Sequence, residues 1–292
     1  MDEPGFKLRD ATIAIVGLGL MGGSLALALR TKNACAKIIG IDSNAATRAQ
    51  AIACNAVDET SDDLSLAARA DVIVLATPAR TIIDLLPRVG AIAHENEIVI
   101  DLGSTKHEIT RAMETLPAHV QAIGGHPMCG KESSGFAAAD ANLFRNATFA
   151  LTPLSRTSTA TLAFAQSFVE TVGARPLVID AEHHDKIVAT TSHLPYVVAS
   201  ALMATANDIS HDEELLFRFA ASGFRDTSRL AASDPTMMID ILLTNRMNVI
   251  KMLQQYSAQL NKLTNLIERA DAAELHAHLQ TIAESRQKIS RG

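Results

Sequence analysis

The stretch that decides the fold is Thr12-Ile-Ala-Ile-Val-Gly-Leu-Gly-Leu-Met-Gly-Gly-Ser24, near the start of the 292-residue chain. A short apolar run is followed by a G-x-G-x-x-G motif and then, from Leu25 to Arg30, by apolar residues with helical periodicity. Gly17 permits a tight turn, Gly19 lets the backbone approach a pyrophosphate, and Gly22 lets helix and strand pack closely. Free N–H groups at the helix start favour an anion. The motif between a strand and a helix therefore predicts a dinucleotide-binding turn over a merely structural one.

The second predicted strand, Lys37 to Ile41, specifies the nucleotide. It leads to Asp42, twenty residues after Gly22, and a carboxylate there accepts hydrogen bonds from the ribose hydroxyls and repels a 2′-phosphate. NAD is the expected cofactor, while Arg48 leaves NADP open. The residues expected to contact the cofactor lie at predicted strand ends or in the glycine turn: Gly17, Gly19, Leu20, Met21, Gly22, Asp42, Thr77 and Ser104.

Strand and helix patterns alternate through the first half of the chain. Further apolar strands are expected at 71–76, 97–101, 119–123 and 147–152, and a last short one at 175–180. Alternation of this kind predicts an α/β fold whose mostly parallel sheet is covered by helices on both faces. We therefore expect an N-terminal Rossmann-like domain over residues 1–153 and an all-α C-terminal domain over residues 154–292.

The segment Ala122-Ile-Gly-Gly-His-Pro-Met-Cys-Gly-Lys-Glu132 carries the candidate catalytic base, His126. Gly124 and Gly125 are expected to end the strand, and Pro127 to stiffen the loop after it. Ligands bind at the carboxyl ends of strands in such sheets, so the imidazole is expected at the site. Ser104 is expected to hydrogen-bond this imidazole and to meet the nicotinamide, with helix capping as its alternative role.

Lys106 is expected to be a solvated helix residue. A Cys129 nucleophile is a weaker hypothesis, since Cys129 lacks a neighbouring base that is itself oriented by a third group.

A long helix is expected from Asp180 to Asp208, kinked at Pro195. Asp185, Ser192 and Tyr196 fall on one of its faces, which indicates either the wall of a site or a helix-bundle face with tolerated polar groups. The run Glu182-His-His-Asp185 has no complete metal-ligand spacing, because adjacent helical residues point about 100° apart. We expect an acidic helix start there and no metal site.

Gly223-Phe-Arg-Asp-Thr-Ser-Arg229 offers a second charged segment, with Gly223 expected to end a helix. Arg225 and Arg229, four residues apart, are spaced to hold an anionic substrate, because guanidinium binds carboxylate in bidentate fashion. A surface ion-pair patch with Asp226 is the alternative. Helix starts are expected at Asp234-Pro235, and helical patterns run from Thr236 to Glu268 and from Ala272 to Ile289.

The bulk composition narrows the class of protein. Lys and Arg number 26 against 32 Asp and Glu, for a net charge of −6, and without a basic cluster neither nucleic acid nor an anionic membrane is an expected partner. Three cysteines without ligand spacing and an N-terminus without a secretion signal indicate a reducing cytoplasm. The apolar segment Ile187 to Ala206 contains histidine, proline and hydroxyl residues, so we expect a buried helix, not a membrane span.

Five segments, in this order along the chain, resemble one known family: Gly17-Leu-Gly-Leu-Met-Gly-Gly-Ser24, Asp101-Leu-Gly-Ser-Thr-Lys106, Gly125-His-Pro-Met-Cys-Gly-Lys-Glu132, Thr191-Ser-His-Leu-Pro195 and Gly223-Phe-Arg-Asp-Thr-Ser-Arg229. Together they resemble the prephenate/arogenate (cyclohexadienyl) dehydrogenases of tyrosine biosynthesis, over about the whole chain. The resemblance implies NAD(P)-dependent oxidative decarboxylation of a cyclohexadienol acid. It also implies a homodimer formed through the helical domain.

The resemblance assigns roles to individual residues. His126 matches the base, Ser104 its orienting partner, and Arg229 the arginine that holds a substrate carboxylate. Further substrate-binding matches are Ser192, His193, Arg225, Asp226 and Glu132, the last near the site mouth.

Two positions depart from the family pattern. Tyr196 stands where many members have a second histidine, and Lys131 stands where many have threonine. Both are expected near the substrate side chain, and Lys131 is hypothesised to favour the pyruvyl group of prephenate over the ammonium of arogenate.

Two rival interpretations remain. A β-hydroxyacid dehydrogenase shares the glycine motif and a helical second domain but uses a catalytic lysine, for which Lys186 is the candidate here. A non-catalytic NAD-binding protein would need neither the His-Pro segment nor the arginines.

Overall fold

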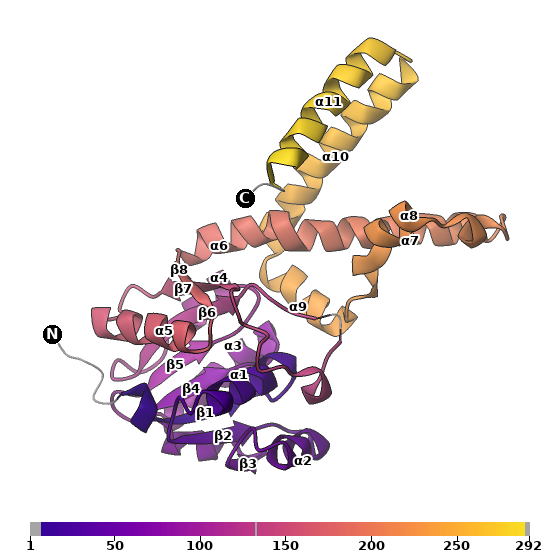
Figure 1. Ribbon diagram of the computed structural model, residues 1–292. Coiled ribbons are helices and arrows are strands. Elements are labelled where there is room, and N and C mark those ends of the chain that lie inside the picture. Colours follow the sequence, from indigo (N-terminus) through magenta and orange to yellow (C-terminus); the bar gives the residue numbers. More distant parts are fainter. Residues whose placement is uncertain (1–6, 132, 290–292) are drawn as a thin grey trace. The chain divides into compact units, whose positions relative to one another are not determined.

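The computed structural model describes residues 7–131 and 133–289, and its described strands form one sheet (Figure 1). The strand order is β3-β2-β1-β4-β5-β6-β7-β8, parallel throughout except for the antiparallel pair β6 and β7. The strands are β1 (Thr12–Val16), β2 (Lys37–Ile41), β3 (Glu59–Ser61), β4 (Val72–Leu75), β5 (Ile98–Asp101), β6 (Gln121–Pro127), β7 (Thr148–Pro153) and β8 (Arg175–Val178). The predicted mostly parallel α/β sheet is confirmed; β3, a short edge strand, was not anticipated.

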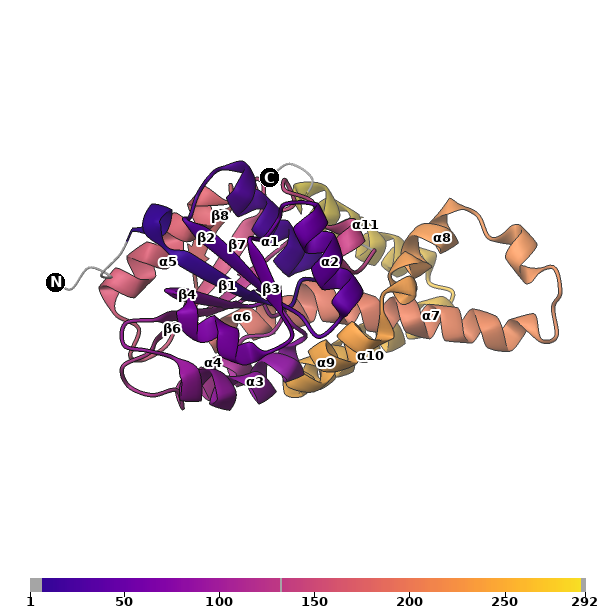
Figure 2. The ribbon, with the colours of Figure 1, turned by 90° about the horizontal axis from the view of Figure 1, so that it is seen from below.

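Helices cover both faces of this sheet, and two apolar clusters fill the space between the layers. Figure 2 shows α1 and the pair α3 and α4 on opposite sides of the sheet. On the face of α1 (Leu20–Thr31), α2 (Ala45–Ala53) and α5 (Thr159–Thr171) also contribute to the core. On the other face lie α3 (Ala79–Ile92) and α4 (His107–Met113). The central strand β1 is apolar on both faces because both are covered.

Strand β6 is longer than the sequence predicts. Gly124 and Gly125 were expected to end it, but it continues through His126 to Pro127 because β7 pairs with it in antiparallel register, with His126 opposite Ala150. A side chain at Gly124 would meet the hydroxyl of Thr152 at 2.1 Å, and one at Gly125 would meet the carbonyl of Asp101 at 2.5 Å. The two glycines therefore let β6 pass close to its neighbours, and His126 lies on a strand and not on a loop.

The predicted long helix spans Ala181–Ser210 in three parts: α6 (Ala181–Val188), a π-helical turn (Ala189–His193) and α7 (Leu194–Ser210). Pro195 is the second residue of α7 and follows the π-helical turn directly, so helical backbone lies on both sides of it. The kink expected at this proline stays a prediction; the irregularity that the structure describes is the π-helical turn directly before it. The helix Ala181–Ser210 is long and apolar enough to cross a membrane by length and composition alone. Only 22% of its most apolar 18-residue stretch is buried within the chain. The expectation of a buried helix is therefore wrong for the single chain.

The remaining helices complete the chain. After α7 come α8 (Ser222–Ser228), the 3-10 turn Arg229–Ala232 and α9 (Pro235–Thr244), which Asp234 caps by accepting from Thr236 N at 2.9 Å. Gly223 lies in the first turn of α8 and does not end a helix, in contrast to the prediction. The predicted helix from Thr236 is broken at Asn245.

Contacts divide the chain into two compact units, Met1–Arg246 and Met247–Gly292. The second unit consists of α10 (Arg246–Glu268), apart from its first residue, and α11 (Ala272–Ile289), which lie side by side (Figure 1). The domain boundary between residues 153 and 154 stays a prediction.

Candidate active site

The carboxyl ends of the central strands bring the predicted residues to one edge of the sheet. Val16, Leu75 and Asp101 are aligned across β1, β4 and β5. The segments that follow carry Gly17, Thr77 and Ser104, and His126 lies on the adjacent β6. Segments far apart in sequence thus meet where ligands bind in sheets of this type.

The glycine turn has the geometry that a dinucleotide needs. Gly17 has φ +93°, a conformation that side chains disfavour. A Cβ at Gly22 would lie 1.8 Å from the Gly17 carbonyl oxygen, so α1 approaches β1 as closely as it does only because Gly22 has no side chain. A Cβ at Gly19, in contrast, would meet no atom within 4 Å, which leaves open space at the start of α1.

Asp42 closes this turn from β2. One carboxylate oxygen accepts from Leu18 N at 2.8 Å, and the other accepts from Asn44 N at 2.8 Å. Arg48 donates to the Asp42 backbone oxygen at 2.6 Å, so its guanidinium is held beside the same strand end. On β4's side, the buried hydroxyl of Thr77 has no hydrogen-bond partner among the described residues. An open approach at Gly19, a carboxylate at the second strand end and an unsatisfied hydroxyl fit a bound dinucleotide.

The side chain of His126 contacts a second histidine. Nδ1 of His126 lies 2.9 Å from Nε2 of His184, and Nδ1 of His184 lies 2.8 Å from a carboxylate oxygen of Asp185. His184 and Asp185 are both buried in α6. The structure shows no hydrogen bond between Ser104 and His126 among the described residues; the hydrogen-bond partner that it gives the imidazole is His184.

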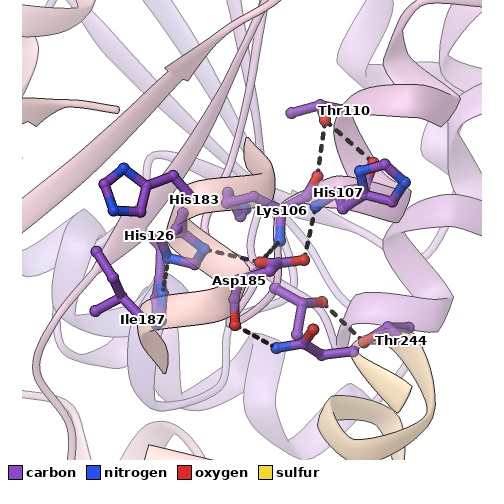
Figure 3. Close-up of polar contacts among 12 residues, drawn as sticks. Lys106, His107, Thr110, His126, His183, Asp185, Ile187 and Thr244 are labelled. Atoms are coloured by element: carbon purple, nitrogen blue, oxygen red, sulfur yellow. Dashed lines mark hydrogen bonds and ion pairs between the residues drawn. The ribbon is translucent and has the colours of Figure 1, made fainter. Parts of the chain in front are cut away.

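Asp185 joins the helical segment to the end of the sheet. Its two carboxylate oxygens accept from the backbone N–H groups of Lys106 at 2.7 Å and His107 at 2.9 Å, at the start of α4 (Figure 3). Asn245 donates from Nδ2 to the backbone oxygen of Asp185 at 2.7 Å. The acidic helix start predicted for this run is better assigned to Asp180, which accepts from His183 N.

Lys106 corrects a prediction. It is fully buried, not solvated, and its ammonium pairs with Asp101 and donates to the Gly125 oxygen at 2.7 Å. Burial raises the pKa of Asp101 and lowers the pKa of Lys106, while the attraction between the two opposes both shifts. The pair fixes the end of β5 against β6, directly before His126.

Electrostatics favour neutral imidazoles at this site. Burial lowers the pKa of His126 well below its usual range, and the charges of His184, Lys106 and His193 act in the same direction. Burial likewise lowers the pKa of His193 to about 4, against the opposing effect of Asp185. Nδ1 of His193 lies 3.3 Å from the Asn245 amide nitrogen, which holds this ring beside Asp185.

The predicted residues of the helical half lie on α7, on the π-helical turn before it, or on segments that pack against α7. Ser192 is in the exposed part of the π-helical turn, and Tyr196 is half-buried in α7. Arg225 and Asp226 are exposed on α8, and Arg229 begins the 3-10 turn after it; both segments pack against α7.

The segment after β6 carries the last residues for which the sequence predicted a role in the site. Lys131 donates to Asp140 at 3.1 Å and to the Ala138 oxygen at 3.2 Å, so its ammonium is held within its own loop. Glu132 lies outside the described residues. Burial raises the pKa of the Cys129 thiol to about 11, which makes it a poor nucleophile.

Sequence reasoning missed His184 and Asp101 as parts of this site, and it valued Asp185 only for its helix face. The helical angle between neighbours implied that His184 and Asp185 also reach partners on different elements, His126 for one and the start of α4 for the other. For His184 and Asp185 the available signal was an acid next to an imidazole at the start of a helix; for Asp101 it was a carboxylate at the end of an apolar strand.

Comparison with known proteins identifies the family. Residues 25–178 match the nucleotide-binding domain of prephenate dehydrogenase, and residues 180–281 match its dimerization domain. The chain is 34% identical to the prephenate dehydrogenase of Bacillus subtilis, over 96% of this chain and 76% of that protein. It is 32% identical to the cyclohexadienyl dehydrogenase of Zymomonas mobilis, over 94% of each.

Solved structures agree. The prephenate dehydrogenase of Aquifex aeolicus, in complex with hydroxyphenyl propionate and NAD+, has a TM-score of 0.90 at 33% identity, covering 95% of this chain and 98% of that one. The arogenate dehydrogenase of Synechocystis has a TM-score of 0.82 at 35% identity, covering 95% and 99%. Both domains of the family match in order, and the chain is 34% identical to a member over 96% of its length, so the chain belongs to the prephenate dehydrogenase family.

Proposed function

We propose that this chain catalyses the NAD-dependent oxidative decarboxylation of prephenate to 4-hydroxyphenylpyruvate, of arogenate to tyrosine, or of both. The observation that carries the proposal is a half-buried imidazole, His126, with a lowered pKa, at the same sheet edge as a dinucleotide turn. A neutral imidazole is suited to accept a hydroxyl proton near neutral pH.

When bound, NAD would supply the acceptor for the hydride that leaves the ring carbinol carbon. The hydroxyl proton would pass to His126, the ring carboxylate would leave as CO2, and its bonding electrons would complete the aromatic ring as a phenolate. The phenolate then takes the proton back from His126 to give the phenol of the product. Electrons balance because the hydride carries two of them to the cofactor. Aromatisation drives the reaction, so no metal is required by the chemistry.

Other residues of the chain position the reactants. Arg229 is proposed to hold a substrate carboxylate, supported by Arg225 and Asp226. Ser192, His193, Tyr196 and Glu132 are proposed to line the substrate site, and Ser104 to contact the nicotinamide. Asp42 is proposed to bind the ribose; Arg48, with its guanidinium near the same strand end, keeps NADP open as a second cofactor.

The test is turnover of each acid by the purified protein with each nicotinamide cofactor, followed as NAD(P)H formation with identification of the aromatic product. His126→Asn should lower kcat by about 10²- to 10⁴-fold, the usual range for a general base. Lys186→Ala, on an exposed residue of α6, should keep activity. Loss of turnover in Lys186→Ala with retention in His126→Asn would favour the β-hydroxyacid scheme instead.

Substrate preference is tested in the same assay. If Lys131 reaches the substrate, Lys131→Thr should move the ratio of kcat/KM for prephenate and arogenate toward arogenate. An unchanged ratio would remove Lys131 from substrate recognition and agree with its pairing to Asp140.

We also propose that the protein is a cytoplasmic homodimer. The matched dimerization domain and the weakly buried apolar segment Ala181–Ser210 support a second copy as the partner of the helical half.

A further inference from the structure

We propose that His184 and Asp185 determine which nitrogen of His126 carries its proton, leaving Nε2 of His126 unprotonated and available as the base. Both are positioning residues, and the inference rests on the proposed function only where turnover is concerned. It starts from two contacts, His126 Nδ1 to His184 Nε2 at 2.9 Å and His184 Nδ1 to Asp185 at 2.8 Å.

The carboxylate of Asp185 fixes the direction of its hydrogen bond with His184. One oxygen of Asp185 already accepts from Lys106 N at 2.7 Å, and the other accepts from His107 N at 2.9 Å. Backbone N–H groups can only donate, so the carboxylate is an acceptor at both oxygens. Figure 3 shows Asp185 directed at these two residues. The hydrogen in the contact between Asp185 and His184 therefore belongs to Nδ1 of His184.

The tautomer of His184 in turn fixes the tautomer of His126. A neutral His184 protonated on Nδ1 presents a lone pair on Nε2, which can only accept. The hydrogen in the 2.9 Å contact then belongs to Nδ1 of His126. The rings meet edge to face, with centroids 5.1 Å apart and planes at 69°. Nε2 of His126 is left with its lone pair, which is the form that a general base needs.

The surroundings oppose the alternative, in which a charged His184 donates to His126 and forces the proton onto Nε2. The charged or titratable groups that face this pair are Lys106 and Asp101 at the end of β5, Asp185 on α6 and His193 in the π-helical turn. Besides burial, Lys106 and His193 already lower the pKa of His126, so the cluster disfavours further positive charge beside that ring.

The arrangement also serves the step in which the base becomes charged. When Nε2 of His126 takes the substrate's hydroxyl proton, the imidazolium keeps its Nδ1–H bond to His184. The carboxylate of Asp185, one ring further, offsets the new positive charge. The backbone of Asp185 is held by Asn245, so the acceptor stays in place while the charge develops.

The test uses three variants of the full-length protein. His184→Phe removes the acceptor with similar ring volume, and His184→Gln offers an amide oxygen that accepts in its place. His183→Phe, an exposed neighbour on the same helix, is the matched control. We expect kcat to fall roughly 10- to 100-fold in His184→Phe, with KM changed less than about threefold, as for groups that act through another residue. His184→Gln should recover most of the loss.

Two readouts separate positioning from a structural role. Nitrogen-15 NMR of the wild-type protein without substrate should report His126 protonated on Nδ1. The acidic limb of the kcat/KM profile should move to lower pH in His184→Phe, because the imidazolium of His126 then loses the acceptor of its Nδ1–H. Folding is checked by the thermal midpoint of each variant.

The inference is overturned if wild-type His126 carries its proton on Nε2, or if the Phe and Gln variants at position 184 are equally impaired. The NMR result stands even if neither cyclohexadienyl acid is turned over, so failure of the proposed function and failure of this inference are distinguishable.

Discussion

Glu97 is a residue-scale feature that lies away from the site, at the entry to β5. Its side chain is fully buried, one carboxylate oxygen accepts from His94 N at 2.9 Å, and the other has no partner among the described residues. Burial raises the pKa of Glu97 from 4.5 to about 7, with the His94 contact opposing the shift and Asp71 adding to it. The folded protein therefore holds this proton more tightly than the unfolded chain does.

This shift predicts how stability depends on pH. The contribution of the Glu97 proton is fully present below about pH 4.5 and is lost as the pH rises to about 7. The variant Glu97→Gln stays neutral, so its free energy of unfolding should rise relative to that of the wild type by about 3 kcal/mol between pH 4.5 and pH 7. Above that window the difference between the two proteins should be constant. Urea unfolding at several pH values measures this. The exposed Glu95→Gln is the control, and a gap that does not widen with pH would contradict the assignment.

At the element scale, two glycines of the turn between β1 and α1 have different roles: Gly22 is needed for packing, and Gly19 leaves room for a ligand. Gly22 is needed for packing, since a Cβ there would lie 1.8 Å from the Gly17 oxygen. Gly19 is not needed for packing, since a Cβ added to it would meet no atom within 4 Å. The open space at Gly19 is where a pyrophosphate would approach the backbone.

Substitutions at these two glycines should therefore have different effects. Gly22→Ala should destabilise the protein by about 1–3 kcal/mol, the usual cost of overpacking, and weaken NAD binding as α1 shifts. Gly19→Ala should leave the thermal midpoint nearly unchanged and still raise the Kd for NAD. Calorimetry of binding and of unfolding measures both. Equal loss of stability in the two variants would mean that Gly19 also has a packing role.

On the scale of the whole molecule, the helical half exposes apolar side chains that a single chain does not cover. In the part that matches the dimerization domain, Phe219 is 81% exposed and Ile209 is 51% exposed. Isolated exposed apolar residues are common, but several in one region indicate an interaction surface. The family match makes a second copy the partner that we expect.

Sedimentation equilibrium should therefore give twice the 31.1 kDa of one chain. Phe219→Asp should raise the dimer Kd at least tenfold, which corresponds to about 1.4 kcal/mol. This is no more than the free energy gained by burying one phenylalanine side chain. Ile52→Asp, on α2 outside the matched dimerization domain, is the control and should leave the mass unchanged. A monomeric wild type would remove the homodimer from the proposal.

What the sequence alone determined depends on short-range patterns. The glycine turn, Asp42 at the second strand end and the strands around β1 follow from periodicity and from backbone requirements within about twenty residues. The helix start at Asp234 was predicted for the same reason, because a capping side chain acts on its immediate neighbours.

Only the tertiary structure decided which side chains meet His126. His184 reaches it across 58 residues, and Asp185 reaches the start of α4 across 79 residues. Lys106 is buried because the ends of β5 and β6 close over it, and β6 runs through two glycines because β7 pairs with it. Such contacts depend on how separate elements pack together, and local periodicity carries no information about that packing.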